Sequence, residues 1–194
     1  MCPSPEDARP ALALDIAEYS VEERQLLLRL AHQSIAATLE NRQLDLTPPN
    51  EHLSELRGAF TTLHRYGKLR GCIGYVLPTQ SLYRTVSETA RAAAFDDPRF
   101  EPVTLQEARD LKIEISVLSH LQPIAPEDIL VGKHGLVVIQ GSRRGLLLPQ
   151  VPVEWRWDRE TFLQQTCIKA GLAPDAWQRG AELQAFTAEV FGEE

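Results

Sequence analysis

The stretch KLRGCIGY, residues 68–75, places a single thiol, Cys72, between Gly71 and Gly74 in an otherwise strand-like run. A glycine inside a strand weakens it, so it usually marks a bulge or a close approach by a ligand or another backbone. An accessible thiol at such a place can act as a nucleophile or carry a group covalently. Cys72 is therefore a candidate catalytic residue, and both glycines are candidate binding residues. The alternative is packing, because free cysteine is among the most buried residue types.

The register of the predicted hairpin decides which side chains lie beside Cys72. A two-residue turn at its tip places Thr61 opposite Cys72. A three-residue turn slips the pairing by one residue and places Thr62 there instead. In that register His64 pairs with Arg70 on the same face. In both registers cations lie near the sulfur and favour its thiolate form, so Arg70 is a candidate catalytic residue and His64 a weaker one for moving protons.

Three further polar residues could reach a ligand. Glu114 lies on the polar face of an alternating strand; it could be a general base if buried, or part of a solvated face. Arg99 could bind a carboxylate in a bidentate manner, or pair with an aspartate where a helix stops at Pro98. His134 precedes Gly135 at the start of a strand, where it could bind a ligand or form hydrogen bonds within a loop.

Composition argues against several other functions. The net charge of −7 disfavours nucleic acid as a partner, because such binding requires a basic stripe. The five histidines are scattered and no CxxC pair is present, so we predict no metal and no cofactor. Widely spaced Cys2, Cys72 and Cys167 suit a reducing compartment. Neither a signal peptide nor a run of about 18 apolar residues is present, so we expect a cytoplasmic protein without a membrane partner.

Hydrophobic patterning predicts the elements that position these residues. Ser20 and Glu23 form a capping box at the start of a helix, and a second helix over residues 81–95 must stop before Pro98. The expected strands are the two runs around the Tyr66–Gly67 turn, residues 111–118, a hairpin over residues 134–150 and a last strand over residues 181–191. Hairpins interspersed with helices indicate an α+β fold with antiparallel or mixed sheets.

The hexapeptide LRGCIG, residues 69–74, resembles the hallmark of the AMMECR domain family. Later blocks resemble the same family in the same order, namely AAAFDDPRF, KIEISVLS, GKHGLVV, GLLLPQV and FLQQTCIKAGL. The likeness runs from about Ser20 to Phe191, nearly the whole chain. It implies an α+β fold with two lobes of unequal size, flanking helices, and the hexapeptide on a functional surface between the lobes.

Prokaryotic members of the family resemble protein A of the three-part AmmeMemoRadiSam system. The resemblance therefore implies a Memo-like protein and a radical-SAM enzyme as partners, and it leaves the reaction open. One hypothesis is a component that binds a partner or presents a small-molecule or peptide ligand in a groove around Cys72. The other is an enzyme that uses Cys72 as a nucleophile or covalent carrier. We expect a loose tail over residues 1–12 and a single two-lobed domain over residues 13–194.

Overall fold

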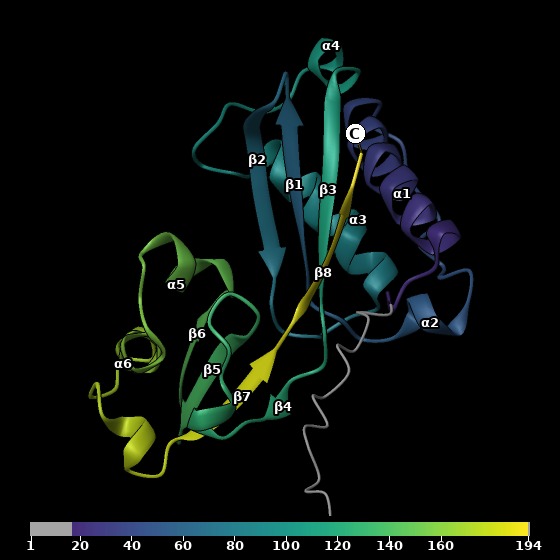
Figure 1. Cartoon of the computed structure of the whole chain (residues 1–194). Helices are drawn as coiled ribbons and strands as arrows, with labels where there is room; N and C mark the ends of the chain where they lie inside the picture. Colours follow the sequence, from purple (N-terminus) through teal and green to yellow (C-terminus); the bar gives the residue numbers. More distant parts are fainter. Residues whose placement is uncertain (1–16, 194) are drawn as a thin grey trace, which may run out of the picture.

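The structure, a computed structural model, describes residues 17–193, and the expected tail over residues 1–12 lies outside them. Helices accompany two four-stranded sheets (Figure 1), and all strand pairs within the sheets are antiparallel. The predicted α+β class is therefore confirmed.

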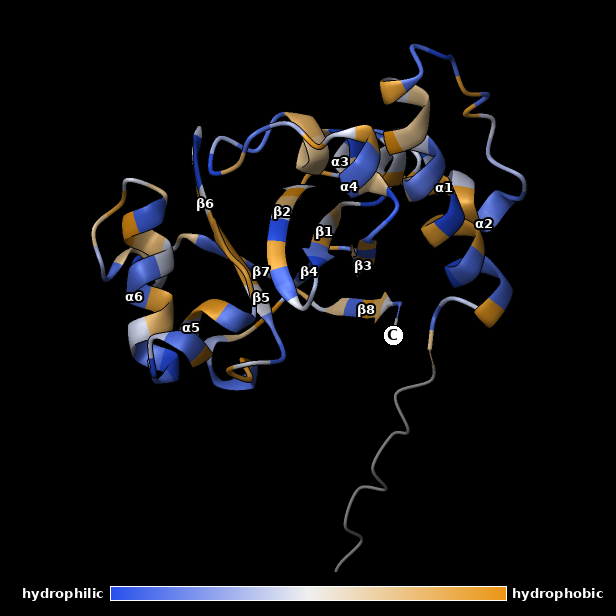
Figure 2. Ribbon diagram, turned by 90° about the horizontal axis from the view of Figure 1, so that it is seen from above, coloured by the Kyte–Doolittle hydropathy of each residue, from blue (hydrophilic) through white to orange (hydrophobic). Residues whose placement is uncertain are grey.

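The first sheet has the strand order β2-β1-β3-β8. Its strands are β1 (Ala59–Arg65), β2 (Lys68–Tyr75), β3 (Leu111–Leu118) and β8 (Ala188–Gly192). The helices on one side of it, seen in Figure 2, are α1 (Val21–Leu39), α3 (Leu82–Phe95) and the short α4 (Leu105–Ala108). Between these helices and the sheet lies the larger apolar core, to which α1 contributes Leu27 and Ile35 and α3 contributes Val86.

Both long helices begin and end where the sequence predicts. Ser20 and Glu23 form the expected reciprocal capping box at the start of α1. The side chain of Ser81 caps α3, which ends at Phe95, ahead of Pro98. A short helix, α2 (Glu51–Ser54), packs against α3.

Alternation along the strands divides the first sheet into two faces. Thr61 and Leu63 of β1 are buried beneath the helices, whereas Thr62 between them is half-buried on the opposite face. We call this opposite face the open face. By register it carries Phe60, Thr62, His64, Cys72, Gly74, Lys112, Glu114, Ser116 and Val190.

The second sheet has the strand order β4-β7-β5-β6 and its own smaller core. Its strands are β4 (Gln122–Pro123), β5 (Gly135–Gln140), β6 (Arg143–Leu147) and β7 (Glu182–Phe186). The helical segments on this part of the chain are η1 (Pro126–Asp128), α5 (Gln150–Glu154), α6 (Arg159–Lys169) and η2 (Ala176–Gln178). Phe162 and Leu163 of α6 pack into this core with Leu136 and Val138 of β5.

A third apolar cluster joins the two sheets. Val137 and Phe186 from the second sheet pack with Leu118 from the end of β3, and Phe60 of the open face packs against them. One end of the open face therefore abuts the second sheet.

The last predicted strand, residues 181–191, is in fact two strands in different sheets. β7 ends at Phe186, Thr187 bridges to Ser119, and β8 begins at Ala188. Alternation continues through the crossing point, so the sequence pattern alone does not reveal the change of sheet. The yellow ribbon in Figure 1 shows this passage from one sheet to the other.

Candidate functional site

The hairpin of β1 and β2 turns at Tyr66 and Gly67, as predicted. Both residues have positive φ, 53° and 74° respectively, which is typical of a two-residue turn. Arg65 pairs with Lys68 across it. Of the two registers considered, the two-residue turn is therefore correct at the tip.

A β-bulge at Arg70 then changes the register. His64 pairs with Leu69, and Arg70 opposes no residue of β1. The extra residue shifts the rest of β2 by one position, so that Cys72 faces Thr62. The three-residue register predicted Thr62 as the partner of Cys72, and this prediction is correct. The same register predicted that His64 pairs with Arg70, and that prediction is wrong.

The bulge also turns Arg70 away from Cys72, which corrects the prediction that its charge lies beside the sulfur. The Arg70 Nε donates to Glu107 Oε1 at 3.2 Å, and its Nη2 donates to the Glu101 carbonyl at 2.9 Å. The hydrogen bonds from Arg70, followed by that from the Thr104 backbone, lower the pKa of Glu107 to about 2. Arg70 thus fastens β2 to α4.

Cys72, Thr62 and Glu114 form a row across three strands of the open face. Cys72 pairs with Thr62, and Thr62 pairs with Glu114. The Thr62 hydroxyl donates to Cys72 Sγ at 3.3 Å. All three residues are half-buried. This row provides a thiol, a hydroxyl and a carboxyl group on a surface that the helices of the first core do not cover.

Two side chains hold the backbone of Cys72 at the outer edge of the sheet. The Cys72 amide donates to Asp97 Oδ2 at 2.9 Å, and the Cys72 carbonyl accepts from Arg99 Nη2 at 3.3 Å. Asp97 and Arg99 also pair with each other at 2.8 Å. They make the two hydrogen bonds that a neighbouring strand would make, and so close this edge at Cys72.

Asp97 is the buried centre of this arrangement, being only 4% exposed. Side-chain hydrogen bonds from Arg99 hold its pKa well below the usual range, and the backbone amides of Cys72 and Arg99 act in the same direction. The carboxylate in turn raises the pKa of Arg99. The predicted pairing of Arg99 with an aspartate after the end of α3 is confirmed.

Both glycines of the hexapeptide are explained by close neighbours within the chain. A Cβ on Gly71 would lie far inside van der Waals contact of the Ala93 carbonyl oxygen in α3. A Cβ on Gly74 would overlap the ring of Phe60. Gly71 therefore faces the helices and does not border the open face, whereas Gly74 lies on that face beneath an aromatic ring.

The two candidate histidines lie in different places. His64 is half-buried on the open face, where it is the next residue of β1 after Thr62 on the same side of the sheet. His134 lies before β5, and its Nδ1 accepts a hydrogen bond from the Leu130 amide at 3.2 Å. Burial lowers the pKa of His134. It forms hydrogen bonds within a loop, which was the alternative to a ligand-binding role.

The structure thus gathers Cys72, Glu114, His64 and Gly74 on one face, with Arg99 at its edge. Sequence reasoning left out Thr62 as a site residue, although one of the two registers placed it opposite Cys72. Asp97 had a visible signal, because it lies two residues before Arg99 beside Pro98. That signal indicates an ion pair, but it does not reveal that the pair binds Cys72.

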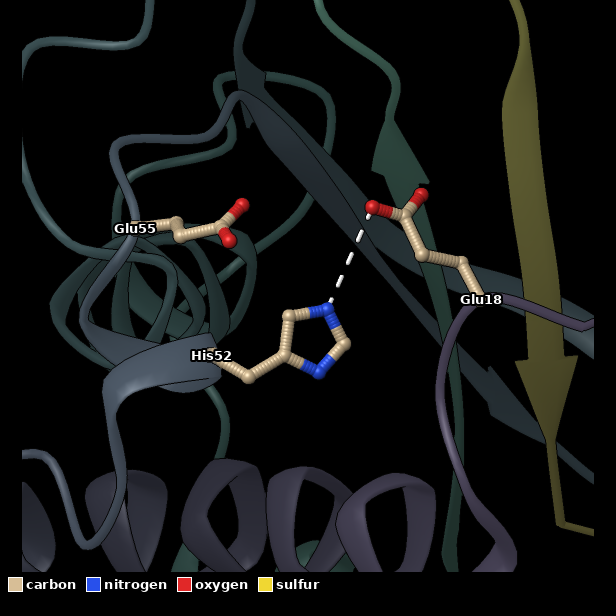
Figure 3. Close-up of side chains that lie close together, drawn as sticks. All are labelled: Glu18, His52 and Glu55. Atoms are coloured by element: carbon tan, nitrogen blue, oxygen red, sulfur yellow. Dashed lines mark ion pairs between the residues drawn. The ribbon is translucent and has the colours of Figure 1, made fainter.

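A separate cluster, Glu18, His52 and Glu55, offers three ligand atoms within 4.8 Å of one another. Figure 3 shows these side chains converging, with the ion pair between His52 and Glu18. The guanidinium of Arg57, which is 4% exposed, already donates to Glu18 and to Glu55. This cation neutralises the carboxylates, so the cluster is an ion-pair network rather than a vacant metal site.

The exposure of the two described cysteines leads to a prediction. Cys72 is half-buried, whereas Cys167 is 0% exposed and its burial raises its pKa. We expect iodoacetamide at pH 8 to alkylate Cys72 at least about 100-fold faster, because Cys167 requires opening of a core. Peptide mapping by mass spectrometry, which also separates Cys2, measures both rates. Equal rates in the folded protein would contradict the exposure of Cys72.

These features define a class: α+β proteins with two antiparallel sheets and a backbone-clamped cysteine on the open face of the larger one. The AMMECR1 family model matches residues 28–191, and the chain belongs to that family.

Two relatives and one solved structure are similar over almost the whole chain. Protein MK0488 of Methanopyrus kandleri is 44% identical, over 91% of this chain and 91% of its own length. Protein PYRAB00100 of Pyrococcus abyssi is 42% identical, over 92% and 94% respectively. The crystal structure of the uncharacterized protein PH0010 from Pyrococcus horikoshii superposes with a TM-score of 0.71 at 43% identity, covering 87% of this chain and 90% of that one. Among residues 17–193, no helix has the length and apolar character needed to cross a membrane.

Proposed function

We propose that this protein is a binding component that docks a partner or presents a substrate on the open face around Cys72. The proposed partners are a Memo-like protein and a radical-SAM enzyme. The resemblance of the sequence to protein A of the AmmeMemoRadiSam system supports this choice of partners. The observation that carries the proposal is the half-buried row of Cys72, Thr62 and Glu114 on a sheet face away from the helices.

The surroundings of the thiol favour binding over independent catalysis. A cysteine nucleophile is usually activated by an adjacent base or cation. Among residues 17–193, the side chain that hydrogen-bonds to Cys72 Sγ is Thr62, a donor without basic character. Arg70 is hydrogen-bonded to Glu107, and His64 lies two residues beyond Thr62 along β1. Arg99 is a cation next to Cys72, but it pairs with Asp97 and donates to the Cys72 carbonyl rather than to the sulfur, so it fixes the backbone, which suits a rigid binding surface.

A second function, a cysteine-dependent enzyme, is favoured by one contact. The Thr62 hydroxyl donates to the sulfur at 3.3 Å, and this contact holds the reacting atom in a fixed position. In this alternative the thiolate donates an electron pair to an electrophilic atom of the substrate, whose leaving group departs with the bonding electrons. Glu114, next in the row, is the candidate to move protons.

Co-expression with both partners tests the proposal. Wild type is expected to co-elute with one of them on size exclusion at about 10 µM, because an interface of standard size remains associated at that concentration. Glu114→Lys reverses a charge at the centre of the open face and is expected to weaken the complex at least about tenfold. Glu160→Lys makes the same change at an exposed position in the first turn of α6 and serves as the matched control.

Equal co-elution of the two charge-reversal variants would overturn the open face as the docking surface. Cys72→Ala separates the two functions. A complex that forms normally with Cys72→Ala but loses all turnover would favour the enzyme, whereas retained turnover would favour binding alone.

A further inference from the structure

The strand β8 is the second edge of the first sheet, and its free side can be deduced from hydrogen-bond parity. The Ser119 amide donates to the Thr187 carbonyl at 2.9 Å, and the Glu193 amide donates to the Ile113 carbonyl at 3.0 Å. Positions 187 and 193 therefore face β3, and the register between them is continuous. In an antiparallel pair the intervening residues alternate. The residues whose amide and carbonyl groups point outward are Ala188, Val190 and Gly192.

These outward groups have no hydrogen-bond partner among residues 17–193. The contrast with β2 is informative, since Asp97 and Arg99 close that edge at Cys72. Along β8 there is no proline, lysine or bulge of the kind that protects natural edge strands. Val190, at the middle of the strand, is 54% exposed. The edge is thus able to pair with another extended chain.

A cavity of about 820 Å³ runs beside this edge. Residues of β8, the chain at Ala17–Glu18 and the loop at Gly132–Lys133 border it. A space that these two segments border beside the strand has room for one extended chain. Its volume falls in the usual range for ligand sites, about 300–1,000 Å³.

The charges beside the cavity indicate which chain would fit. Glu189 is satisfied by Arg24 at 2.9 Å and by the Glu18 amide at 2.6 Å. Glu18 pairs with Arg57. Lys133 forms no ion pair with any residue from Ala17 to Glu193, so it is the cation left to attract a ligand. An acidic side chain in the incoming strand would complement it.

We propose that the edge of β8 accepts an extended polypeptide segment from a partner protein, added as a fifth strand of the first sheet. Outward amides and carbonyls of β8 pair with its main chain, the small residues Ala188 and Gly192 of β8 admit β-branched residues beside them, and Lys133 receives an acidic residue. This site is on the edge opposite Cys72 and does not depend on the function proposed for that residue.

Random nonapeptides displayed on phage provide the probe, selected against the full chain and then synthesised with fluorescein for anisotropy. Val190→Pro removes one outward donor without breaking a bond to β3, and an edge strand tolerates it. Val190→Thr keeps that donor and is the matched control. Selected peptides are expected to bind Val190→Pro about fivefold more weakly than Val190→Thr, which corresponds to about 1 kcal/mol for a hydrogen bond.

Two further measurements sharpen the test. Lys133→Glu is expected to weaken binding several-fold at low salt and less at high salt, and to favour peptides without acidic residues. Cys72→Ala is expected to leave binding unchanged.

Four results would overturn the proposal. Three of them are no peptide enriched above background, equal affinity of the two Val190 variants, and cross-linking of the Val190→Cys variant to residues 1–16 of the same chain. A dimer seen by light scattering that Val190→Pro abolishes would also overturn it, in favour of pairing between two copies.

Discussion

Gly71→Ala is expected to lower the free energy of unfolding by about 3 kcal/mol or more, because overpacking against a rigid neighbour is costly. The new methyl group would lie far inside contact distance of the Ala93 carbonyl oxygen. That oxygen belongs to the backbone of α3, so no rotamer change relieves the overlap. The helix must move away from β2, and the core between them, which includes Val86 and Ala90, would be disrupted. Urea denaturation followed by circular dichroism measures the loss.

Gly74→Ala provides the control for this prediction. Its methyl group would meet the ring of Phe60, a side chain that can rotate, so we expect a smaller loss of about 1–2 kcal/mol. Shortening the ring by Phe60→Leu should reduce the loss caused by Gly74→Ala, which a double-mutant cycle would register as coupling. No comparable substitution rescues Gly71→Ala. Equal losses of unfolding free energy for the two glycine variants would contradict the explanation that Gly71→Ala meets a rigid backbone atom and Gly74→Ala a movable side chain.

Local signals were sufficient to predict most elements of the fold. The capping residue Ser20 and the stop at Pro98 determine helix ends through contacts a few residues apart. Strict alternation predicted β3 for the same reason. The division of the final run into β7 and β8 depends instead on which sheet each half joins, and that is decided by partners far away in the sequence, such as Ser119 for Thr187.

The candidate site was only partly predictable because one bulge controls it. Alternation assumes an unbroken strand, and under that assumption Arg70 and Cys72 share a face. The bulge at Arg70 removes that relation, and Glu107, in α4, then binds the arginine. The glycines did signal a close approach, as their residue type suggested. The identity of the approaching atoms, from Ala93 and Phe60, required the packed structure.

The two edges of the first sheet explain why one region holds Cys72 rigidly while another stays available. At β2, Asp97 and Arg99 take the place of a neighbouring strand and fix the backbone on which the thiol is mounted. At β8, the outward groups around Val190 remain without partners among the described residues. Because side chains close the sheet at the Cys72 edge, the proposed addition of a strand at the β8 edge would leave the cysteine undisturbed.

Asp97→Ala is expected to lower the free energy of unfolding by about 3 kcal/mol and to change the behaviour of Cys72. The substitution leaves the Cys72 amide without its acceptor, and an unpaired buried donor bears its full desolvation cost. It also removes the charge-assisted hydrogen bonds from Arg99, whose half-exposed side chain remains solvated. With the edge released, iodoacetamide should alkylate Cys72 several-fold faster. Asp97→Asn, which keeps the shape and one acceptor oxygen, is expected to lose about half as much stability.

The stability difference between wild type and Asp97→Asn should depend on pH in one direction only. The folded-state pKa of Asp97 lies below its unfolded value of about 3.9, because Arg99 and the two backbone amides bind the carboxylate. The stabilisation is therefore complete above about pH 5 and declines as the pH falls below about 4. Glu107 is present in both proteins, so its own acid titration cancels in the difference. Denaturation curves between pH 7 and pH 2.5 measure this; a difference that grows in acid, or one that changes between pH 6 and pH 8, would show that the carboxylate of Asp97 does not hold Cys72 in place.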